Sequence, residues 1–316
     1  MATVLVTGIA GQDGGYLAER LTAEGHEVHG LVTAGDPQRE DLAARVPQAR
    51  LHVGDLRDAA RLADLLADVD PDEVYHLGGP SSVAQSWAEP VLFAEVVGLA
   101  SARLLELAWH RRESGRDVRV LVASSAEVFG APAAVPQDES TPLRPMSPYG
   151  AAKAYAQQLA RVYRQRGLHV CTVVLYNHES PRRPPSFVTR KITSTVAAIA
   201  RGRADALVLG NLDARRDWGW APDYVDAMVR ALRHPEAGEY VVATGRAHSV
   251  RDLVAVAFRH VGIEDWEPLV RSDPALVRPL DAPLLVGEAT RAHEVLGWSP
   301  TVGFEQMVAA MVDAEL

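Results

Sequence analysis

Cysteine is almost missing from this sequence of 316 residues, because Cys171 is the only one. An internal disulfide is therefore excluded, and the chain suits a reducing compartment. Cys171 lies in the apolar run HVCTVVLY. We interpret it as a buried structural thiol rather than a nucleophile.

Long apolar runs are missing as well. No stretch approaches the roughly 18 uninterrupted apolar residues that a membrane span needs. The first residues, MATVLVTG, contain no basic segment followed by a long apolar one, so no signal peptide is expected. We therefore expect no membrane association and a cytoplasmic location.

Basic residues are fewer than acidic ones in this sequence. The chain has 32 basic and 41 acidic residues, a formal net charge of −9, and only two lysines, Lys153 and Lys191. This balance argues against non-specific nucleic-acid binding, which depends on neutralising phosphates. A hydrophobic share of 47% with 23% charged residues is typical of a globular protein.

The first half of the chain alternates short β-branched runs with helical patterns. Strands are predicted at 3–7, 27–32, 51–53, 73–77, 119–123 and 169–175. Helices are predicted at 16–24, 59–67, 91–112 and 150–165. This alternation predicts the α/β class, with a doubly wound parallel sheet covered by helices on both faces.

The pattern changes after about residue 176, where proline, glycine and tryptophan become denser and a helix is predicted at 187–201. We expect a dinucleotide-binding domain at 1–176 and a smaller substrate-binding region at 177–316. Residues of about 214–245 are expected to rejoin the first domain, because 240–243 (YVVA) reads as a further strand.

The first predicted strand runs directly into the glycine-rich sequence GIAGQDG, followed by a helix. Glycine permits a tight turn and close approach of the backbone to a diphosphate, and a helix N-terminus offers free N–H groups and a positive dipole end. A glycine-rich turn between strand and helix therefore predicts dinucleotide binding by Gly8, Gly11, Gln12, Asp13 and Gly14.

The preferred dinucleotide stays open at this point. NAD-binding proteins usually carry a carboxylate at the end of the second strand, and NADP-binding proteins carry arginine nearby. Here the strand is followed by Thr33, Ala34, Gly35 and then Asp36. Asp36 comes late, while Arg39 or Arg57 would reach a 2′-phosphate only if the loop folded back.

A group of catalytic residue types surrounds the end of the strand at 119–123. Tyr149 and Lys153 are one helical turn apart, so their side chains share a face. The ammonium is expected to lower the pKa of the phenol, which would let Tyr149 act as a general base. Ser125 follows the strand, and Glu127, two residues later, is a candidate base for a carbon-bound proton.

The chain resembles the GDP-mannose 4,6-dehydratase family, an extended short-chain dehydrogenase/reductase (Rossmann) family, over nearly its whole length. The matching segments are GIAGQDGGYLAE, PDEVYHL, SSAEVFG, SPYGAAKAYA, NHESPRR, FVTRKI and LGNLDARRDWG. The last three separate the family from epimerases and decarboxylases of the same superfamily.

The resemblance implies a reaction in several steps. Tyr149 takes the proton of a sugar 4-hydroxyl while C4 gives a hydride to NAD(P)+. Glu127 then removes the C5 proton, water leaves from C6, and the hydride returns to C6. The product would be a 4-keto-6-deoxy sugar, most directly from GDP-mannose, and no metal is implied.

The resemblance also assigns contact residues. The implied cofactor contacts beyond the glycine-rich turn are Asp55, Leu56, Leu77, Gly78, Gly79, Ser81, Tyr149, Lys153, His178 and Arg183. The implied substrate contacts are Ser125, Asn177, Lys191, Arg216, Arg278 and Asp281.

Several positions depart from the family pattern. NADP is implied by the resemblance, but Thr33 and Ala34 replace the paired arginines that hold its 2′-phosphate, so NAD is possible. The shortened loop behind them favours a homodimer formed through a helical bundle over a tetramer. Gly79-Pro80 replaces Ala-Gln beside the expected nicotinamide, Ala126 replaces serine, and Asp281 replaces glutamate.

Two other functions are compatible with these motifs. One is an NAD(P)-dependent nucleotide-sugar epimerase or reductase of the same fold, but such an enzyme needs no base at C5. The other is a dinucleotide-sensing protein without catalysis. The presence of Ser125, Tyr149 and Lys153 argues against it.

Overall fold

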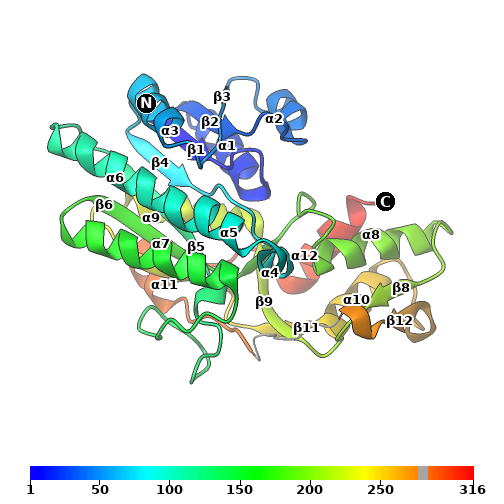
Figure 1. The fold of residues 1–316 in the computed structure, drawn as a ribbon. Helices are drawn as coiled ribbons and strands as arrows, with labels where there is room; N and C mark the ends of the chain where they lie inside the picture. Colours follow the sequence, from blue (N-terminus) through cyan, green and yellow to red (C-terminus); the bar gives the residue numbers. More distant parts are fainter. Residues whose placement is uncertain (277–283) are drawn as a thin grey trace.

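A computed structural model describes residues 1–276 and 284–316 of the chain (Figure 1). Its centre is a seven-stranded sheet in the order β10-β6-β5-β4-β1-β2-β3. The strands are β1 (Thr3–Thr7), β2 (Glu27–Val32), β3 (Arg50–Val53), β4 (Glu73–His76), β5 (Arg119–Ser125), β6 (His169–Leu175) and β10 (Glu239–Val242). Every pairing is parallel. The predicted doubly wound α/β fold is confirmed, with its switch point between β1 and β4.

Helices cover both faces of this sheet, and α6 and α7 run side by side across one of them (Figure 1). That face is covered by α3 (Ala59–Val69), α6 (Ala100–Glu113) and α7 (Pro148–Gln165). The other is covered by α1 (Gln12–Ala23), α9 (Ala221–Arg233) and α11 (Thr290–Leu296). Each face has its own apolar core, as expected for a parallel sheet buried on both sides.

A smaller unit adjoins the carboxyl ends of the strands (Figure 1). Its sheets contain β7 (Asn177–Glu179), β9 (Arg215–Trp220) and β11 (Ala247–Ser249), and separately β8 (Leu207–Leu209) and β12 (Val270–Ser272). Its helices are α8 (Val188–Ala200), α10 (Val250–His260) and α12 (Phe304–Asp313). Their apolar faces form a third core. The division of the chain at residues 176 and 177 stays a prediction.

The remaining elements connect the layers. They are α2 (Arg39–Arg45), α4 (Val83–Ala88), α5 (Pro90–Phe93), a π-helical turn η1 (Ala94–Leu99) and short 3₁₀ turns at Ala126–Val128, Glu267–Leu269 and Pro274–Leu276. None of the helices in the described part of the chain is both long and apolar enough to cross a bilayer.

Two helices differ from their prediction. Helix α1 begins at Gln12, not at residue 16, because Gly11 adopts an extended conformation and ends the turn. The single helix predicted at 91–112 is divided by η1. There Gly98 packs against Ala152 and Tyr155 of α7, and η1 shifts the helical register at that contact.

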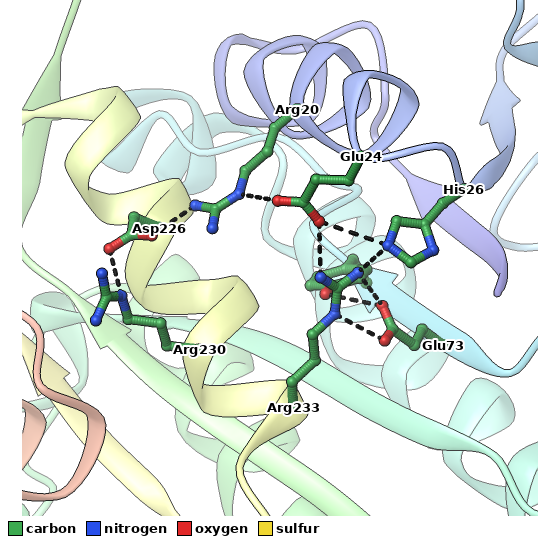
Figure 2. Close-up of polar contacts among 8 residues, drawn as sticks. Arg20, Glu24, His26, Glu73, Asp226, Arg230 and Arg233 are labelled. Atoms are coloured by element: carbon green, nitrogen blue, oxygen red, sulfur yellow. Dashed lines mark hydrogen bonds and ion pairs between the residues drawn. The ribbon is translucent and has the colours of Figure 1, made fainter. Parts of the chain in front are cut away.

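A network of charged side chains joins α1, α9 and β4 at the amino-terminal edge of the sheet (Figure 2). Arg233 bonds both carboxylate oxygens of Glu73, at 2.9 and 3.2 Å, and a carboxylate oxygen of Glu24 at 2.7 Å. Arg20 joins Glu24 to Asp226 at 2.8 and 2.6 Å. Because Glu73 is buried, Arg233 is the partner that makes its charge tolerable.

We expect Arg233→Ala to lower the free energy of unfolding by about 2–3 kcal/mol, since it leaves the buried Glu73 carboxylate without its guanidinium. Urea denaturation followed by circular dichroism measures the loss. Arg50→Ala is the control. Arg50 is exposed and pairs with the half-exposed Glu27, and its loss should cost about 0.5 kcal/mol. Equal costs for the two variants would contradict this account.

Candidate active site

The glycine-rich turn after β1 packs against the loop after β4. Gly8 has a φ of +72°, and a Cβ there would lie 2.7 Å from the Cα of Gly78. A Cβ on Gly14 would lie 2.3 Å from the carbonyl oxygen of Gly8. Only glycine permits these approaches, so the sequence GIAGQDG is required for the first turn of α1 to sit over the strand ends.

A cleft of about 420 Å³ opens at this edge of the sheet. The predicted cofactor contacts that line it are Gly8, Gly11, Asp55, Leu56, Leu77, Gly78 and Gly79. Gly11, the residue before α1, has no side chain to cap the first N–H groups of the helix, which leaves them for an anionic ligand. These features fit the diphosphate and adenosine of a dinucleotide.

Further cleft residues come from the segments after β2 and β3. Asp36 and Gln38 line the cleft although they follow β2 by several residues. The N–H of Asp36 donates to the carbonyl oxygen of Thr33 at 3.2 Å, and this turn folds the chain back. Arg57 also lines the cleft, but its guanidinium pairs with Asp55 at 2.6 Å.

Ser125, Glu127 and Tyr149 meet at the end of β5. Glu127 lies on the 3₁₀ turn that follows Ser125, and its N–H donates to the Ser125 hydroxyl at 3.3 Å. Ser147 caps α7 by accepting from the N–H of Gly150 at 3.0 Å, which places Tyr149 in the first turn. A Cβ on Gly150 would lie 2.5 Å from the carbonyl oxygen of Glu127, so glycine lets α7 approach this turn.

The phenol of Tyr149 does not have the lowered pKa that the sequence predicted. Burial raises the pKa of Tyr149 to about 12, and the nearby charge of Glu127 adds to this, while a hydrogen bond with Ser125 and the charge of Arg183 oppose it. The ring packs edge-on against Phe93, with centroids 6.0 Å apart. Burial therefore outweighs the Ser125 hydrogen bond and the charge of Arg183.

Lys153 lies on the same face of α7, with its ammonium 5.9 Å from the centroid of the Tyr149 ring. The ammonium donates to the carbonyl oxygen of Ala123 at 2.7 Å. Burial lowers the pKa of Lys153 to about 8, against the opposing charge of Asp13. Lys153 is thus held at the end of β5, mostly protonated at neutral pH.

His76 lies behind these residues and was not predicted as part of the site. Its Nδ1 is 2.8 Å from the Thr7 hydroxyl and its Nε2 is 3.0 Å from the Ser101 hydroxyl. Ser101 donates to the carbonyl oxygen of Val97, so it accepts from Nε2–H, and Thr7 donates to Nδ1. Burial, followed by the charge of Lys153, lowers the pKa of His76 to about 3 and keeps the ring neutral.

Strand β7 joins the smaller unit to the glycine-rich turn. His178 Nε2 lies 2.8 Å from a carboxylate oxygen of Asp13. Gln12 donates to the carbonyl oxygen of His178 at 3.1 Å and accepts from the Ser180 hydroxyl at 2.8 Å. The segment NHESPRR and the turn GIAGQDG, far apart in the sequence, are therefore in direct contact.

Arg183 is held beside this junction. Its Nε lies 3.1 Å from a carboxylate oxygen of the buried Glu179, which also accepts from the Thr189 hydroxyl at 2.5 Å. The guanidinium lies 3.8 Å from the centroid of the Phe187 ring. The sequence did not predict that Glu179 orients Arg183, although both belong to the NHESPRR segment.

The predicted substrate contacts are less completely placed. Asn177 begins β7 opposite Trp218 of β9, and Lys191 lies in the first turn of α8. Arg216 is buried on β9, where it donates to the carbonyl oxygen of Arg215 at 2.7 Å. Arg278 and Asp281 lie outside the described residues.

Asp217, next to Arg216, was not predicted. Its buried carboxylate accepts from the N–H groups of Thr244 and Gly245, both at 2.9 Å, and from that of Gly287 at 3.3 Å. Burial raises the pKa of Asp217 in spite of these bonds. Asp217 therefore holds together the backbone at Thr244, Gly245 and Gly287.

Comparisons with known proteins agree with the sequence motifs. The family model for GDP-mannose 4,6 dehydratase matches residues 5–311. GDP-mannose 4,6 dehydratase 1 of Arabidopsis thaliana is 43% identical, across 99% of this chain and 89% of the relative.

Two solved structures share the fold. UDP-glucose 4-epimerase of Thermus thermophilus, in complex with NAD, has a TM-score of 0.86 at 30% identity and covers 99% of this chain and 98% of its own. The RMD protein of Pseudomonas aeruginosa, complexed with NADPH, has a TM-score of 0.80 at 26% identity and covers 100% and 99%. The predicted resemblance is confirmed, and the chain belongs to the GDP-mannose 4,6-dehydratase family.

Proposed function

We propose that the protein is a nucleotide-sugar 4,6-dehydratase that converts GDP-mannose to GDP-4-keto-6-deoxy-mannose, in the cytoplasm. The observation that carries this proposal is the position of Glu127. It adds a carboxylate to the Ser125, Tyr149 and Lys153 set, on the turn packed against the first turn of α7. Elimination of water needs a base at C5, and Glu127 is the candidate.

The side chains have distinct proposed roles. Tyr149 takes the proton of the sugar 4-hydroxyl, Ser125 hydrogen-bonds the 4-oxygen, and the ammonium of Lys153 favours the phenolate. A nicotinamide ring bound at this edge would supply positive charge in its oxidised form and a reversible acceptor for the hydride of C4. Deprotonation of Tyr149 depends on such added positive charge, because its surroundings, with burial as the largest cause, raise its pKa to about 12.

Glu127 acts once C4 is a ketone, which acidifies the C5 proton. We propose that it removes this proton and donates it to the hydroxyl leaving C6, so that water departs. C5 then takes up a proton through Glu127 as C6 becomes a methyl group, and the proton that Tyr149 took from the 4-hydroxyl supplies the balance, so both side chains return to their starting states. The net change is the loss of one water. Ala126 provides no second acid in this turn, so Glu127 carries both transfers.

We propose that the nucleotide-sugar binds between the strand ends and the smaller unit. Asn177, Lys191 and Arg216 come from three different elements of that unit, and arginine suits a diphosphate. The roles of Arg278 and Asp281 rest on the resemblance to the family. Lys191 supports the proposal because its ammonium has no hydrogen bond or ion pair with any described residue.

For the cofactor we propose NAD rather than NADP. One carboxylate oxygen of Asp36 accepts from the N–H of Gln38 at 3.0 Å, and the other suits a ribose hydroxyl. Arg57 is the one cationic side chain among the described residues that line the cleft, and it already pairs with Asp55. A 2′-phosphate would therefore meet net negative charge.

We propose that two copies of the chain associate through α4 to α7. The exposed large apolar side chains of this surface are Trp87, Val91, Leu99, Tyr155 and Val162. They lie on helices that run side by side (Figure 1). A pair of these helices from each copy would form a four-helix bundle that buries this surface. We therefore propose a homodimer and no tetramer.

The first experiment tests the reaction. Incubation with GDP-mannose should give a product lighter by one water in mass spectrometry. Glu127→Gln should still oxidise C4, seen as reduced-nicotinamide absorbance and a 4-ketone, but should not eliminate water, since the amide is no base. Unchanged dehydration by this variant would remove Glu127 from the mechanism. Absence of a dehydrated product from every GDP-hexose and GDP-heptose would refute the function.

The second experiment measures the dissociation constants of NADH and NADPH by fluorescence titration. The wild type should bind NADH at least about tenfold more tightly than NADPH. Asp36→Asn should reduce this preference by about tenfold, because the carboxylate charge is lost. Asp64→Asn, an exposed carboxylate of α3, is the control and should leave the ratio unchanged. Tighter binding of NADPH by the wild type would overturn the NAD proposal.

The third experiment determines the mass in solution by light scattering after size-exclusion chromatography. The wild type should have the mass of a dimer, and Val91→Glu should shift it to a monomer because the charge would be buried at the interface. Val295→Glu, at an exposed position of α11, should stay dimeric. A wild-type monomer would contradict the proposed interface.

A further inference from the structure

Asp13 occupies an unusual place for a carboxylate. It is the second residue of α1, and Gly11, the residue before the helix, has no side chain to cap it. The N–H groups and positive dipole end of this turn are the proposed cradle of the cofactor diphosphate. A carboxylate at the same helix end would repel that diphosphate unless a cation balanced it.

The cation is supplied by β7. The Nδ1 of His178 lies 2.7 Å from the carbonyl oxygen of Tyr176, and the Nε2 lies 2.8 Å from Asp13. The carbonyl oxygen is an acceptor, and so is Asp13 when it is ionised. With Asp13 ionised, both ring nitrogens therefore carry protons and the ring is an imidazolium. Its ring stacks on Tyr224, with centroids 4.7 Å apart and planes at 19°.

Charge and burial around the pair agree with this protonation. Burial by itself would raise the pKa of Asp13, but the charge and hydrogen bond of His178, with help from Gln12 and Arg183, lower it. Burial would lower the pKa of His178, yet Asp13 raises it, while Arg183 opposes. Each partner thus holds the other in its charged form.

We propose that Asp13 and His178 form a charge-balancing pair for the cofactor diphosphate. His178 cancels the carboxylate beside the cradle, and Asp13 keeps His178 protonated. Asp13 acts through His178 and is a positioning residue. Because His178 belongs to β7, dinucleotide binding then depends on docking of the NHESPRR segment against the glycine-rich turn. This inference rests on the proposed binding of a nicotinamide dinucleotide.

The proposed pair predicts a result that a direct contact between His178 and the cofactor does not predict. If His178 served only as a hydrogen-bond donor to the cofactor, its loss would weaken binding whatever residue stood at position 13. If it balances Asp13, its loss matters because a carboxylate is left uncompensated. Removing that carboxylate as well should then restore binding, so the double variant distinguishes the two roles.

The test is a cycle of four proteins: wild type, Asp13→Asn, His178→Gln and the double variant. The dissociation constant of NADH is measured by fluorescence titration at low and high salt. We expect His178→Gln to weaken binding about tenfold at low salt and less at high salt. Asp13→Asn should bind at least as tightly as wild type, and the double variant within about threefold of wild type.

Controls separate the possible failures. Thermal denaturation identifies any variant that does not fold, and Asp41→Asn, an exposed carboxylate of α2, should bind like wild type. A double variant as weak as His178→Gln would overturn the charge-balancing role. Wild-type protein that binds neither NADH nor NADPH would instead refute the proposed function, and the pair's role with it.

Discussion

Close backbone contact at the carboxyl edge of the parallel sheet is the constraint on which the rest of this structure depends. Gly8 touches Gly78 after β4, Gly14 touches the carbonyl of Gly8, and Gly150 touches that of Glu127. At each contact a Cβ would lie 2.7 Å or less from a backbone atom. Without these glycines, α1 and α7 could not begin where the strands end. The cleft and the side chains of Ser125 and Tyr149 would then not lie at the same edge of the sheet.

Burial at this edge determines the charge of each group. His76 stays neutral because burial, followed by the charge of Lys153, lowers its pKa to about 3. Lys153 keeps its proton near neutral pH although burial lowers its pKa to about 8. Tyr149 is held as a phenol. The protein by itself therefore keeps both Lys153 and Tyr149 protonated near neutral pH.

The small unit is in direct contact with the glycine-rich turn. Its strand β7 contacts the glycine-rich turn through Gln12 and Asp13, and Glu179 on the same strand orients Arg183. The two halves of the site are thus coupled by buried polar contacts. At the opposite edge of the sheet, the Arg233 network ties α1 and α9 to β4, so α1 is held at both ends.

Much of the fold and of the candidate site was predictable from local patterns. Alternating apolar strands and helices determined the doubly wound sheet, GIAGQDG determined the turn, and the spacing of Tyr149 and Lys153 placed both on one face of α7. These features depend on residues close together in the chain. The tertiary structure alone decided that Asp36 folds back to the cleft, that burial raises the pKa of Tyr149, and that Asp13 meets His178. Each of these depends on segments distant in sequence, whose contacts and dielectric surroundings no local pattern specifies.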